Sequence, residues 1–301
     1  MAETGGSTAF VLGSGGLRGA NQVGMMRALL ERGYVPDLVV GSSIGAVNGA
    51  VLASDPTVAT LDRLEATWLR FATMAGALAP WLSSRTRAAQ HFRARLLART
   101  VVELLGPGVR VQDLAVPLAV VATDLRRSRP VVLRQGDLVQ ALLATAALPG
   151  VLPAVPLDGA LLVDGGLVRG VPLREAAELG ARRVVVLRAA GADAPLGAAS
   201  SVRSARWLAY EVARRHQYGA EKDRLPADVE LVELPSGGDL LRDGVSVLTD
   251  ARAVRRRMTE GYRAAGAVLD ARETSRARAS GRSGPAPGTS AGQRAEGGGH
   301  R

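Results

Sequence analysis

The chain has 301 residues, a formal net charge of +10, no cysteine, and a composition that is 47% hydrophobic and 22% charged. This composition is typical of a globular protein and excludes a wholly disordered chain, while the missing thiols exclude disulfides, thiolate metal sites and a cysteine nucleophile. Aromatic residues make up only 3% of the sequence, so we expect no base-stacking surface and no nucleic-acid partner.

The start of the chain alternates between strand-like and helix-like patterns. Residues 8–12 are apolar and predict a buried strand, which leads through the glycine-rich segment 13–19 into an amphipathic helix that stops at Gly33. A second short strand over residues 38–40 turns at residues 41–45 into another helix. This alternation of strands and helices predicts a parallel α/β sheet.

The rest of the chain divides into three parts. Residues 55–107 have helical and irregular patterns with many arginines. Later strand patterns occupy residues 118–122, 131–133, 161–163, 184–187 and 229–234, and two helices are expected near 201–220 and 249–270. Residues 271–301 are rich in Gly, Ser, Ala, Pro and Arg, which predicts a disordered tail. We therefore expect one domain over residues 1–270 and a tail over 271–301.

Segment 55–107 is also the candidate cover of a site. Its apolar residues stand beside arginines, which would suit a lid that faces a membrane. The alternative is ordinary packing of these helices on the sheet. The apolar residues concerned are Trp68, Phe71, Met74, Leu78 and Trp81.

Nothing in the sequence indicates export or a membrane span. The first seven residues lack the basic and apolar regions of a secretory signal. The apolar stretch 138–163 is broken by three prolines and by Asp158, so we expect no spanning helix there. We expect a cytoplasmic protein, and its positive charge favours peripheral contact with an anionic membrane surface, with a solvated arginine-rich surface as the alternative.

The glycine-rich segment 13–19 is suited to bringing a ligand close to the backbone. It lacks the lysine of a Walker loop, and Arg18 stands where a dinucleotide fingerprint requires its third glycine. Backbone N–H groups on a glycine turn at the start of a helix can instead stabilise a developing negative oxygen, as an oxyanion hole does. A tight turn without any ligand is the alternative.

Gly41-Ser42-Ser43-Ile44-Gly45 matches the Gly-x-Ser-x-Gly pattern, the sharp turn that exposes a serine hydroxyl between a strand and a helix. A second match at residues 288–292 lies in the low-complexity tail, with no strand before it. Ser43 is therefore the candidate nucleophile, and it needs a base.

Asp164 is the candidate base that lies at the end of a predicted strand. It follows the strand at 161–163 and precedes two glycines, at the sheet edge where parallel α/β proteins keep their sites. Partial burial would raise its pKa from about 3.9 and make it a better base. The histidines of the chain are His91, His216 and His300, and a triad of Ser43, Asp164 and His216 stays open as an alternative.

Three motifs in this order resemble the patatin-like phospholipase family. They are Gly13-Ser14-Gly15-Gly16-Leu17-Arg18-Gly19, Gly41-Ser42-Ser43-Ile44-Gly45 and Asp164-Gly165-Gly166, supported by the linking segments 122–125 and 144–153. The resemblance covers residues 8–190 well and 190–270 loosely. It implies a three-layer α/β/α sandwich with a mainly parallel sheet, a Ser–Asp dyad without histidine, and hydrolysis of lipid acyl esters without a metal or any other cofactor.

The resemblance also assigns roles to single residues. Ser43 would be the nucleophile and Asp164 the general base. The oxyanion site would consist of Gly13, Gly15 and Gly16, with Arg18 as the basic residue of that loop. The supporting glycines of the motifs would be Gly41, Gly45, Gly165 and Gly166.

The sequence therefore predicts a serine hydrolase that cleaves carboxylic ester bonds of lipids or phospholipids, of the phospholipase A or lysophospholipase type. Two alternatives stay open: an esterase of the α/β-hydrolase type with His216 in a triad, and a catalytically silent module that binds or regulates. The expected partner is a lipid or another acyl ester.

Overall fold

The structure, a computed structural model, describes residues 7–189, 197–198, 202–236 and 250–279. In these residues eight strands form one sheet, in the order β5-β6-β3-β2-β1-β7-β8 with β4 also paired to β3. Its parallel part consists of β3 (Leu118–Asp124), β2 (Leu38–Ser42), β1 (Thr8–Leu12), β7 (Arg183–Leu187) and β8 (Glu230–Leu234). The antiparallel strands are β4 (Arg129–Leu133), β5 (Val155–Leu157) and β6 (Ala160–Val163).

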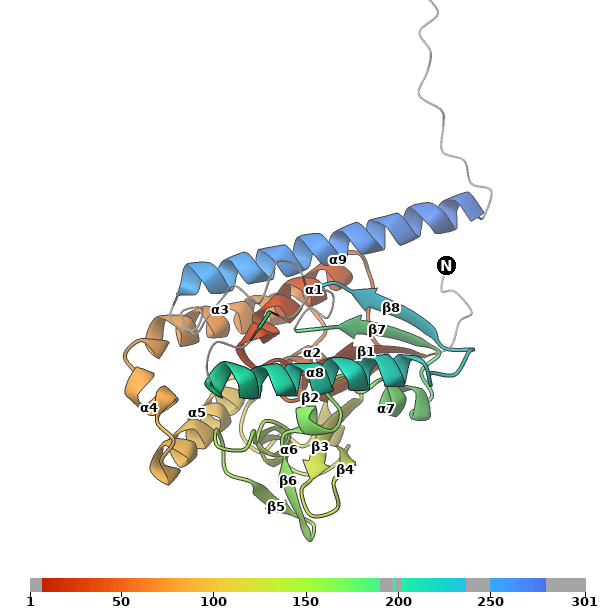
Figure 1. Cartoon of the computed structure of the whole chain (residues 1–301). Coiled ribbons are helices and arrows are strands. Elements are labelled where there is room, and N and C mark those ends of the chain that lie inside the picture. The colour runs from red at the N-terminus through yellow and green to blue at the C-terminus, as the bar shows by residue number, and fades with distance from the viewer. Residues whose placement is uncertain (1–6, 190–196, 199–201, 237–249, 280–301) are drawn as a thin grey trace, which may run out of the picture.

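Helices cover both faces of the sheet, so the molecule is a three-layer α/β sandwich (Figure 1). Successive residues of β1 point to opposite faces, and Phe10 and Leu12 join one buried cluster while Ala9 and Val11 join another. The first cluster includes side chains of α1 (Ala20–Glu31), α2 (Ile44–Ser54), α3 (Val58–Ala75), α6 (Leu138–Thr145) and α9 (Ala251–Ala279). The second includes side chains of α7 (Leu173–Glu178) and α8 (Val202–Lys222).

Segment 55–107 forms α3, α4 (Ala79–Ser83) and α5 (Arg87–Leu105). Its two tryptophans have opposite environments. Trp68 is buried in the core and its Nε1 donates a hydrogen bond to Asn48 Oδ1 at 3.2 Å, whereas Trp81 of α4 is 47% exposed. For Trp68 the prediction of a membrane-facing lid is wrong, because an indole packed against α2 has no surface to offer a lipid.

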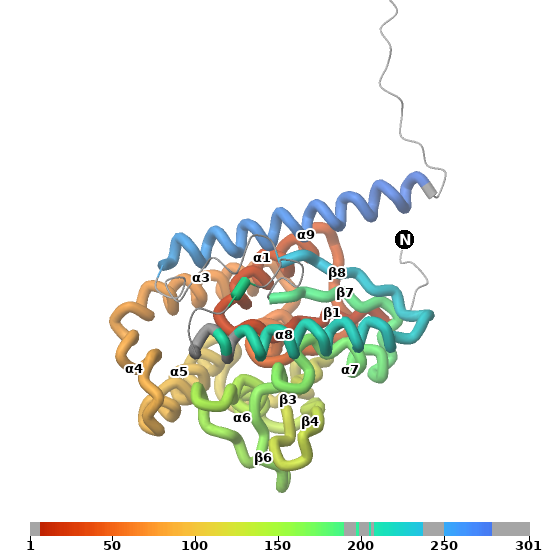
Figure 2. Tube along the Cα trace, viewed as in Figure 1, coloured from red at the N-terminus to blue at the C-terminus, as the bar shows by residue number. Residues whose placement is uncertain are grey.

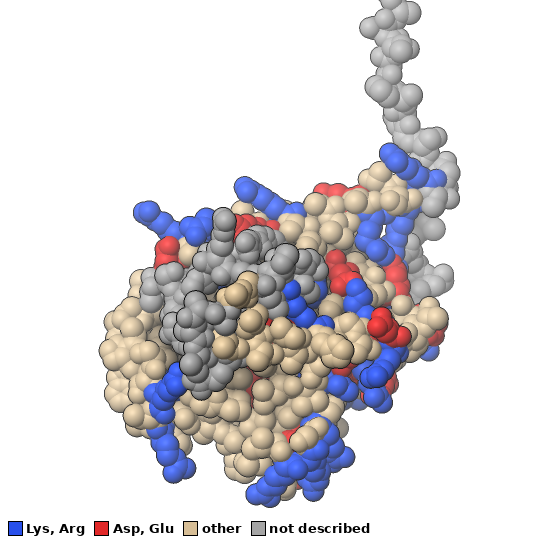
Figure 3. Space-filling model, viewed as in Figure 1, with Lys and Arg blue, Asp and Glu red and all other residues tan. Residues whose placement is uncertain are grey.

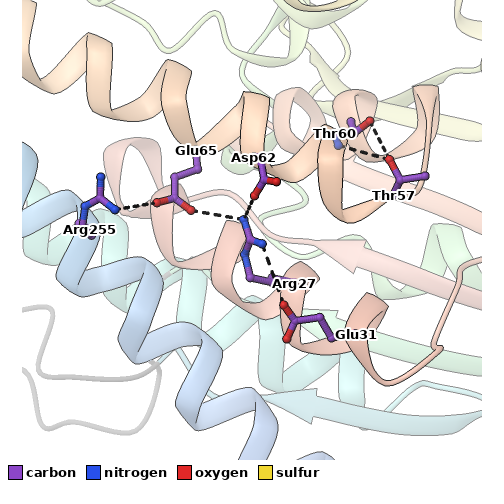
Figure 4. A network of polar contacts seen from close by, with 7 residues as sticks. All are labelled: Arg27, Glu31, Thr57, Thr60, Asp62, Glu65 and Arg255. Carbon is purple, nitrogen blue, oxygen red and sulfur yellow. Dashed lines mark hydrogen bonds and ion pairs between the residues drawn. The ribbon is translucent and has the colours of Figure 1, made fainter.

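Helix α9 lies along α1, although the two are far apart in the sequence (Figure 2). The axes come close because residue 24 is glycine: a Cβ at Gly24 would lie 1.8 Å from the carbonyl oxygen of Met258. Charged side chains join α1, α3 and α9 at one end, where Arg27 bonds to Asp62 and Glu65, and Glu65 also pairs with Arg255 (Figure 4).

The last described helix is longer than the sequence predicts. Helix α9 continues from the expected end at Asp270 to Ala279, so the prediction of disorder is wrong for residues 271–279. The remainder of the predicted tail, residues 280–301, lies outside the described residues. Among the helices that the structure describes, none is both long enough and apolar enough to cross a bilayer.

Candidate active site

Ser43 occupies the turn between β2 and α2 in a strained backbone conformation. Its φ is 55° and its ψ −129°, a region that non-glycine residues adopt at a cost of about 1–3 kcal/mol. The turn lies close against β1, because a Cβ at Gly45 would lie 2.2 Å from the carbonyl oxygen of Leu12. It is also tight within itself, because a Cβ at Gly41 would lie 2.4 Å from Ala46 Cα, in the first turn of α2. The glycines of the motif therefore permit this tight turn beside the glycine-rich loop.

Ser43 and Asp164 meet at the carboxyl edge of the sheet. The hydroxyl of Ser43 donates a hydrogen bond to Asp164 Oδ2 at 2.7 Å, and both residues are buried. The other carboxylate oxygen accepts the N–H of Gly166 at 2.7 Å, and the N–H of Asp164 donates to the carbonyl of Ala147 at 3.1 Å. Strand β3 adds a further bond, since Thr123 Oγ1 donates to the carbonyl oxygen of Asp164 at 2.9 Å.

The environment of Asp164 sets its proton affinity. Burial raises the pKa of Asp164 to about 6, against the opposing effect of the hydrogen bonds from Ser43 and Gly166. A buried carboxyl with this pKa can both accept and release a proton near neutral pH, which is what a general base and acid must do. The carboxyl of Asp164 can therefore take a proton from the Ser43 hydroxyl and pass it on.

The amides of the glycine-rich loop differ in their hydrogen bonds. Gly13 donates to the carbonyl of Leu187 at 3.1 Å, and Ser14 to that of Gly170 at 2.7 Å. The prediction of Gly13 as an oxyanion donor is thus wrong, because its N–H is committed to β7. The amides of Gly15 and Gly16 have no acceptor among the hydrogen bonds of the described residues, and they lie at the start of the 3₁₀ turn Gly16–Gly19 that leads into α1.

The side chain of Arg18 lies among the charges of α8 and α9. Its amide donates to the carbonyl of Gly15 at 3.3 Å. Burial lowers the pKa of its guanidinium, against the opposing charge of Glu211, and Arg214 and Arg257 lower it further. The structure therefore places this basic group beside residues of the two C-terminal helices.

The structure does not bring a described histidine to this pair. His216 is exposed on α8, and the carboxylate oxygens of Asp164 bond to Ser43 and Gly166. His91 is exposed on α5 with its Nδ1 2.8 Å from the carbonyl of Arg87, and His300 lies outside the described residues. The arrangement thus gives no support to the triad with His216.

Thr145 is a site residue that the sequence did not single out. Its Oγ1 accepts the N–H of Ser43 at 2.8 Å and donates to the carbonyl of Val121 at 2.5 Å, so it joins the serine turn to β3. The only signal was its place in segment 144–153, which contributed to the family resemblance as a whole. A threonine within an apolar run gave no reason to assign it this contact.

Tyr210 of α8 is a second residue that was missed. A Cβ at Gly166 would lie 2.7 Å from the Tyr210 hydroxyl oxygen and 2.9 Å from both Asp164 Oδ1 and Ser14 Oγ, so these three polar atoms converge there. Burial and the charge of Asp164 raise the pKa of Tyr210 to about 12, which keeps its hydroxyl protonated. No motif marks this residue, because a helix pattern does not reveal which residue faces the site.

Comparison with protein families and with curated proteins gives consistent matches. The family model described as patatin-like phospholipase matches residues 10–177. An uncharacterized NTE family protein of Mycobacterium tuberculosis strain H37Rv is 36% identical over 201 residues, which is 66% of this chain and 54% of that protein. The human patatin-like phospholipase domain-containing protein 6 is 30% identical over 231 residues, 76% of this chain and 16% of that protein. The chain thus spans about half the length of the mycobacterial relative and a smaller share of the human one.

Comparison with solved structures matches the fold. The crystal structure of VipD from Legionella pneumophila aligns with a TM-score of 0.50 and 15% sequence identity, over 88% of this chain and 67% of that chain. At this identity the likeness concerns the fold, and it agrees with the three-layer arrangement of helices around a mixed sheet.

Proposed function

This chain belongs to the patatin-like phospholipase family, and from that premise we propose that it is a serine hydrolase that cleaves carboxylic ester bonds of lipids. The observation that carries the proposal is the 2.7 Å hydrogen bond from Ser43 to Asp164, beside a glycine-rich loop whose Gly15 and Gly16 amides have no acceptor among the described residues. The substrate class we propose is a phospholipid or lysophospholipid. This class fits the description of the family and the name of the human relative, both of which refer to patatin-like phospholipases.

In the first half of the reaction, the Ser43 Oγ attacks the ester carbonyl carbon while its proton passes to Asp164 Oδ2. The carbonyl oxygen becomes negative, and the amides of Gly15 and Gly16 are the groups we assign to stabilise it; losing one such donor typically costs about 10²–10³ in rate. When the tetrahedral intermediate collapses, Asp164 returns the proton to the leaving alcohol or lysolipid. The acyl group stays on Ser43.

In the second half, Asp164 accepts a proton from water, and the resulting hydroxide attacks the acyl carbonyl. The same loop amides stabilise the second tetrahedral intermediate. Its collapse releases the fatty acid, and the proton on Asp164 returns to the Ser43 oxygen. The pKa of about 6 supports this role, because the carboxyl must gain and lose a proton in each half.

Labelling by a fluorophosphonate probe tests the proposal, because only an activated serine reacts readily with it. We expect the wild type to be labelled and Ser43→Ala to be unlabelled, with hydrolysis of a nitrophenyl ester and release of fatty acid from lysophosphatidylcholine lowered by about 10⁴-fold or more. Ser42→Ala is the matched control, since Ser42 is the adjacent serine and is completely buried, and we expect it to keep its labelling.

Two outcomes would contradict the proposal. Equal labelling of the Ser43→Ala protein would show that another residue reacts. A folded wild type that neither labels nor hydrolyses any of these esters would instead identify a catalytically silent binding module.

A further inference from the structure

Arg93 of α5 is a buried arginine that binds the backbone of two separate segments. Its guanidinium donates to the carbonyl oxygens of Trp81 at 2.7 Å and Ser84 at 2.8 Å, at the end of α4. On its other side it donates to the carbonyl of Val151 at 2.8 Å, in the loop that follows α6. One side chain thus holds α4 and this loop next to each other, and its burial lowers the pKa of Arg93.

The two segments joined by Arg93 carry exposed apolar side chains. Trp81 is 47% exposed, Val151 38% and Leu148 36%. The indole of Trp81 is held in place by the ring of Phe92, whose centroid lies 5.2 Å away. Water-exposed apolar side chains held together on a surface indicate an interaction site more than isolated ones do.

The charge around these side chains has one sign. Residues 66–102 include six arginines and no acidic residue, and residues 138–157 include no charged residue at all. Arg85 and Arg87 are exposed next to α4. In Figure 3 the surface over α4 is uncharged and has basic side chains beside it. Such a surface combines apolar contact with attraction to negative charge, and neither of the two segments adds an acidic group to oppose it.

The same loop leads directly to the candidate active site. Thr145 accepts the N–H of Ser43, the carbonyl of Ala147 accepts the N–H of Asp164, and Val151 bonds to Arg93. A segment of seven residues therefore connects the serine turn, the aspartate and the exposed apolar side chains. Leu148, one of the exposed apolar residues, directly follows the backbone partner of Asp164.

We propose that Trp81, Leu148, Val151, Arg85 and Arg87 form a docking surface for an anionic lipid bilayer. Tryptophan favours the interface between acyl chains and headgroups, and each arginine close to an anionic surface adds attraction. This inference rests on the proposed function, because a bilayer is where an enzyme of this kind meets its substrate. The docking surface would place Ser43 beside the headgroups.

Co-sedimentation with vesicles tests the docking surface. Every variant is made in the Ser43→Ala protein, so that binding is measured without turnover. Vesicles of phosphatidylglycerol and phosphatidylcholine are compared with vesicles of phosphatidylcholine alone. We expect binding to the anionic vesicles, weakening with salt, and a loss of about fivefold for each arginine removed, so that Arg85→Glu with Arg87→Glu loses at least about 25-fold. Trp81→Ala and Val151→Asp should also weaken binding.

Matched control variants test whether the loss of binding is specific to this surface or follows from any change of charge or of an exposed apolar residue. Val35 is 52% exposed in the loop before β2, so Val35→Asp changes a valine that is even more exposed than Val151 and lies at the opposite edge of the parallel strands. Arg126 and Arg129 are exposed around the β3–β4 turn, so Arg126→Glu with Arg129→Glu makes the same charge change elsewhere. We expect both controls to retain most of the binding, and circular dichroism should report an unchanged fold for all variants.

Three results would overturn the inference. In the first, the controls lose as much vesicle binding as the docking-surface variants. In the second, the docking-surface variants bind vesicles as well as their Ser43→Ala parent. In the third, Trp81→Ala abolishes a self-association that is seen without vesicles, which would make a second copy of the chain the occupant. Because the assay uses an inactive parent, each of these results leaves the fluorophosphonate labelling of Ser43 unaffected. Failure of the docking surface and failure of the proposed function are thus distinguishable.

Discussion

Asp164 is a buried carboxyl whose hydrogen-bond partners are the neutral hydroxyl of Ser43 and the N–H of Gly166. These bonds favour the charged form, but burial disfavours it more strongly, so the pKa of Asp164 rises to about 6. A carboxyl balanced in this way can serve as a base without a histidine. Two consequences at this residue can be measured separately, one on activity and one on stability.

Activity should depend on the ionisation of Asp164. Below a pH of about 6 the carboxyl of the free enzyme is protonated and cannot accept the proton of Ser43. We expect kcat/KM for a soluble nitrophenyl ester to fall about tenfold for each pH unit below that value and to level off above it. A profile that stays flat down to a pH of about 4 would contradict the assignment of Asp164 as the base.

The stability of the fold should also depend on the ionisation of Asp164, but in the opposite direction. The charged form that activity requires is the form that burial destabilises. The pKa of an unperturbed aspartate is 3.8, and that of Asp164 in the folded protein is about 6. The native state therefore binds the proton more tightly than the unfolded chain does. The cost of the buried charge is therefore absent below a pH of about 4 and complete above about 6. We expect Asp164→Asn to be more stable than wild type above that range by up to about 3 kcal/mol, measured by urea unfolding. A stability difference independent of pH would contradict this.

Thr145 offers a test of how the serine turn is held. Replacing it with valine leaves the buried N–H of Ser43 and the carbonyl of Val121 without the hydroxyl that joins them, at an expected cost of about 1–3 kcal/mol in unfolding free energy. We also expect a lower kcat, since the strained turn loses a support. Thr145→Ser keeps the hydroxyl and is the control. Equal kcat and stability in both variants would show that the bond does not matter.

Single residues differ in how well the sequence reveals them. Ser43 and Asp164 could be predicted because each follows a strand pattern and has a reactive group. The assignment of Gly13 as an oxyanion donor fails because its N–H bonds to the carbonyl of Leu187 in β7. The spacing of residues within the loop cannot show this long-range bond. Thr145 and Tyr210 reach the site from α6 and α8, and their contacts depend on the packing of these helices rather than on a motif.

At the scale of the elements, the parallel strands were predictable and the short helices were not. Buried strands such as β1 and β7 appear in the sequence as apolar runs bounded by loops, and the structure places them within a few residues of the expected ranges. Helix α6 begins in the apolar stretch 138–163 that also includes β5 and β6. Short apolar runs do not distinguish helix from strand, and α7, with six residues, gives too short a pattern.

The contact between η3 (Gly165–Leu167) and β3 depends on a glycine. A Cβ at Gly165 would lie 2.0 Å from the carbonyl oxygen of Val121, so Gly165→Ala must displace the aspartate turn. We expect at least a 10²-fold lower kcat, since small misplacements of reacting groups cost about that much. Gly76→Ala is the control: Gly76 caps α3 with φ −61° and has open space around it, so stability should be equal or higher. Full activity of Gly165→Ala would contradict the placement.

At the scale of the whole molecule, α9 connects parts that are distant in the sequence. It packs along α1 and reaches β8, where Arg272 and Arg276 both pair with Glu230. Near the same end the Tyr34 hydroxyl donates to Glu273 at 3.2 Å. Residues 271–279 share the Ala, Arg and Ser of the tail but contain none of its glycines or prolines, so they are compatible with a helix, and averaging the composition over residues 271–301 placed the boundary too early. The long-range partners of this part of α9 are not visible in the composition.

Truncation tests whether this end of α9 contributes to stability. A protein that ends at Asp270 loses Arg272, Glu273 and Arg276, and with them their contacts to Glu230 and Tyr34. Partly exposed ion pairs contribute about 0–1 kcal/mol each, so we expect a loss of about 1–2 kcal/mol, which lowers Tm by about 2–8 °C in a domain of this size. A protein that ends at Ala279 retains these contacts and should keep the Tm of the full chain in calorimetry. Identical Tm values for the two truncated proteins would mean that α9 stabilises the molecule only through its packing along α1.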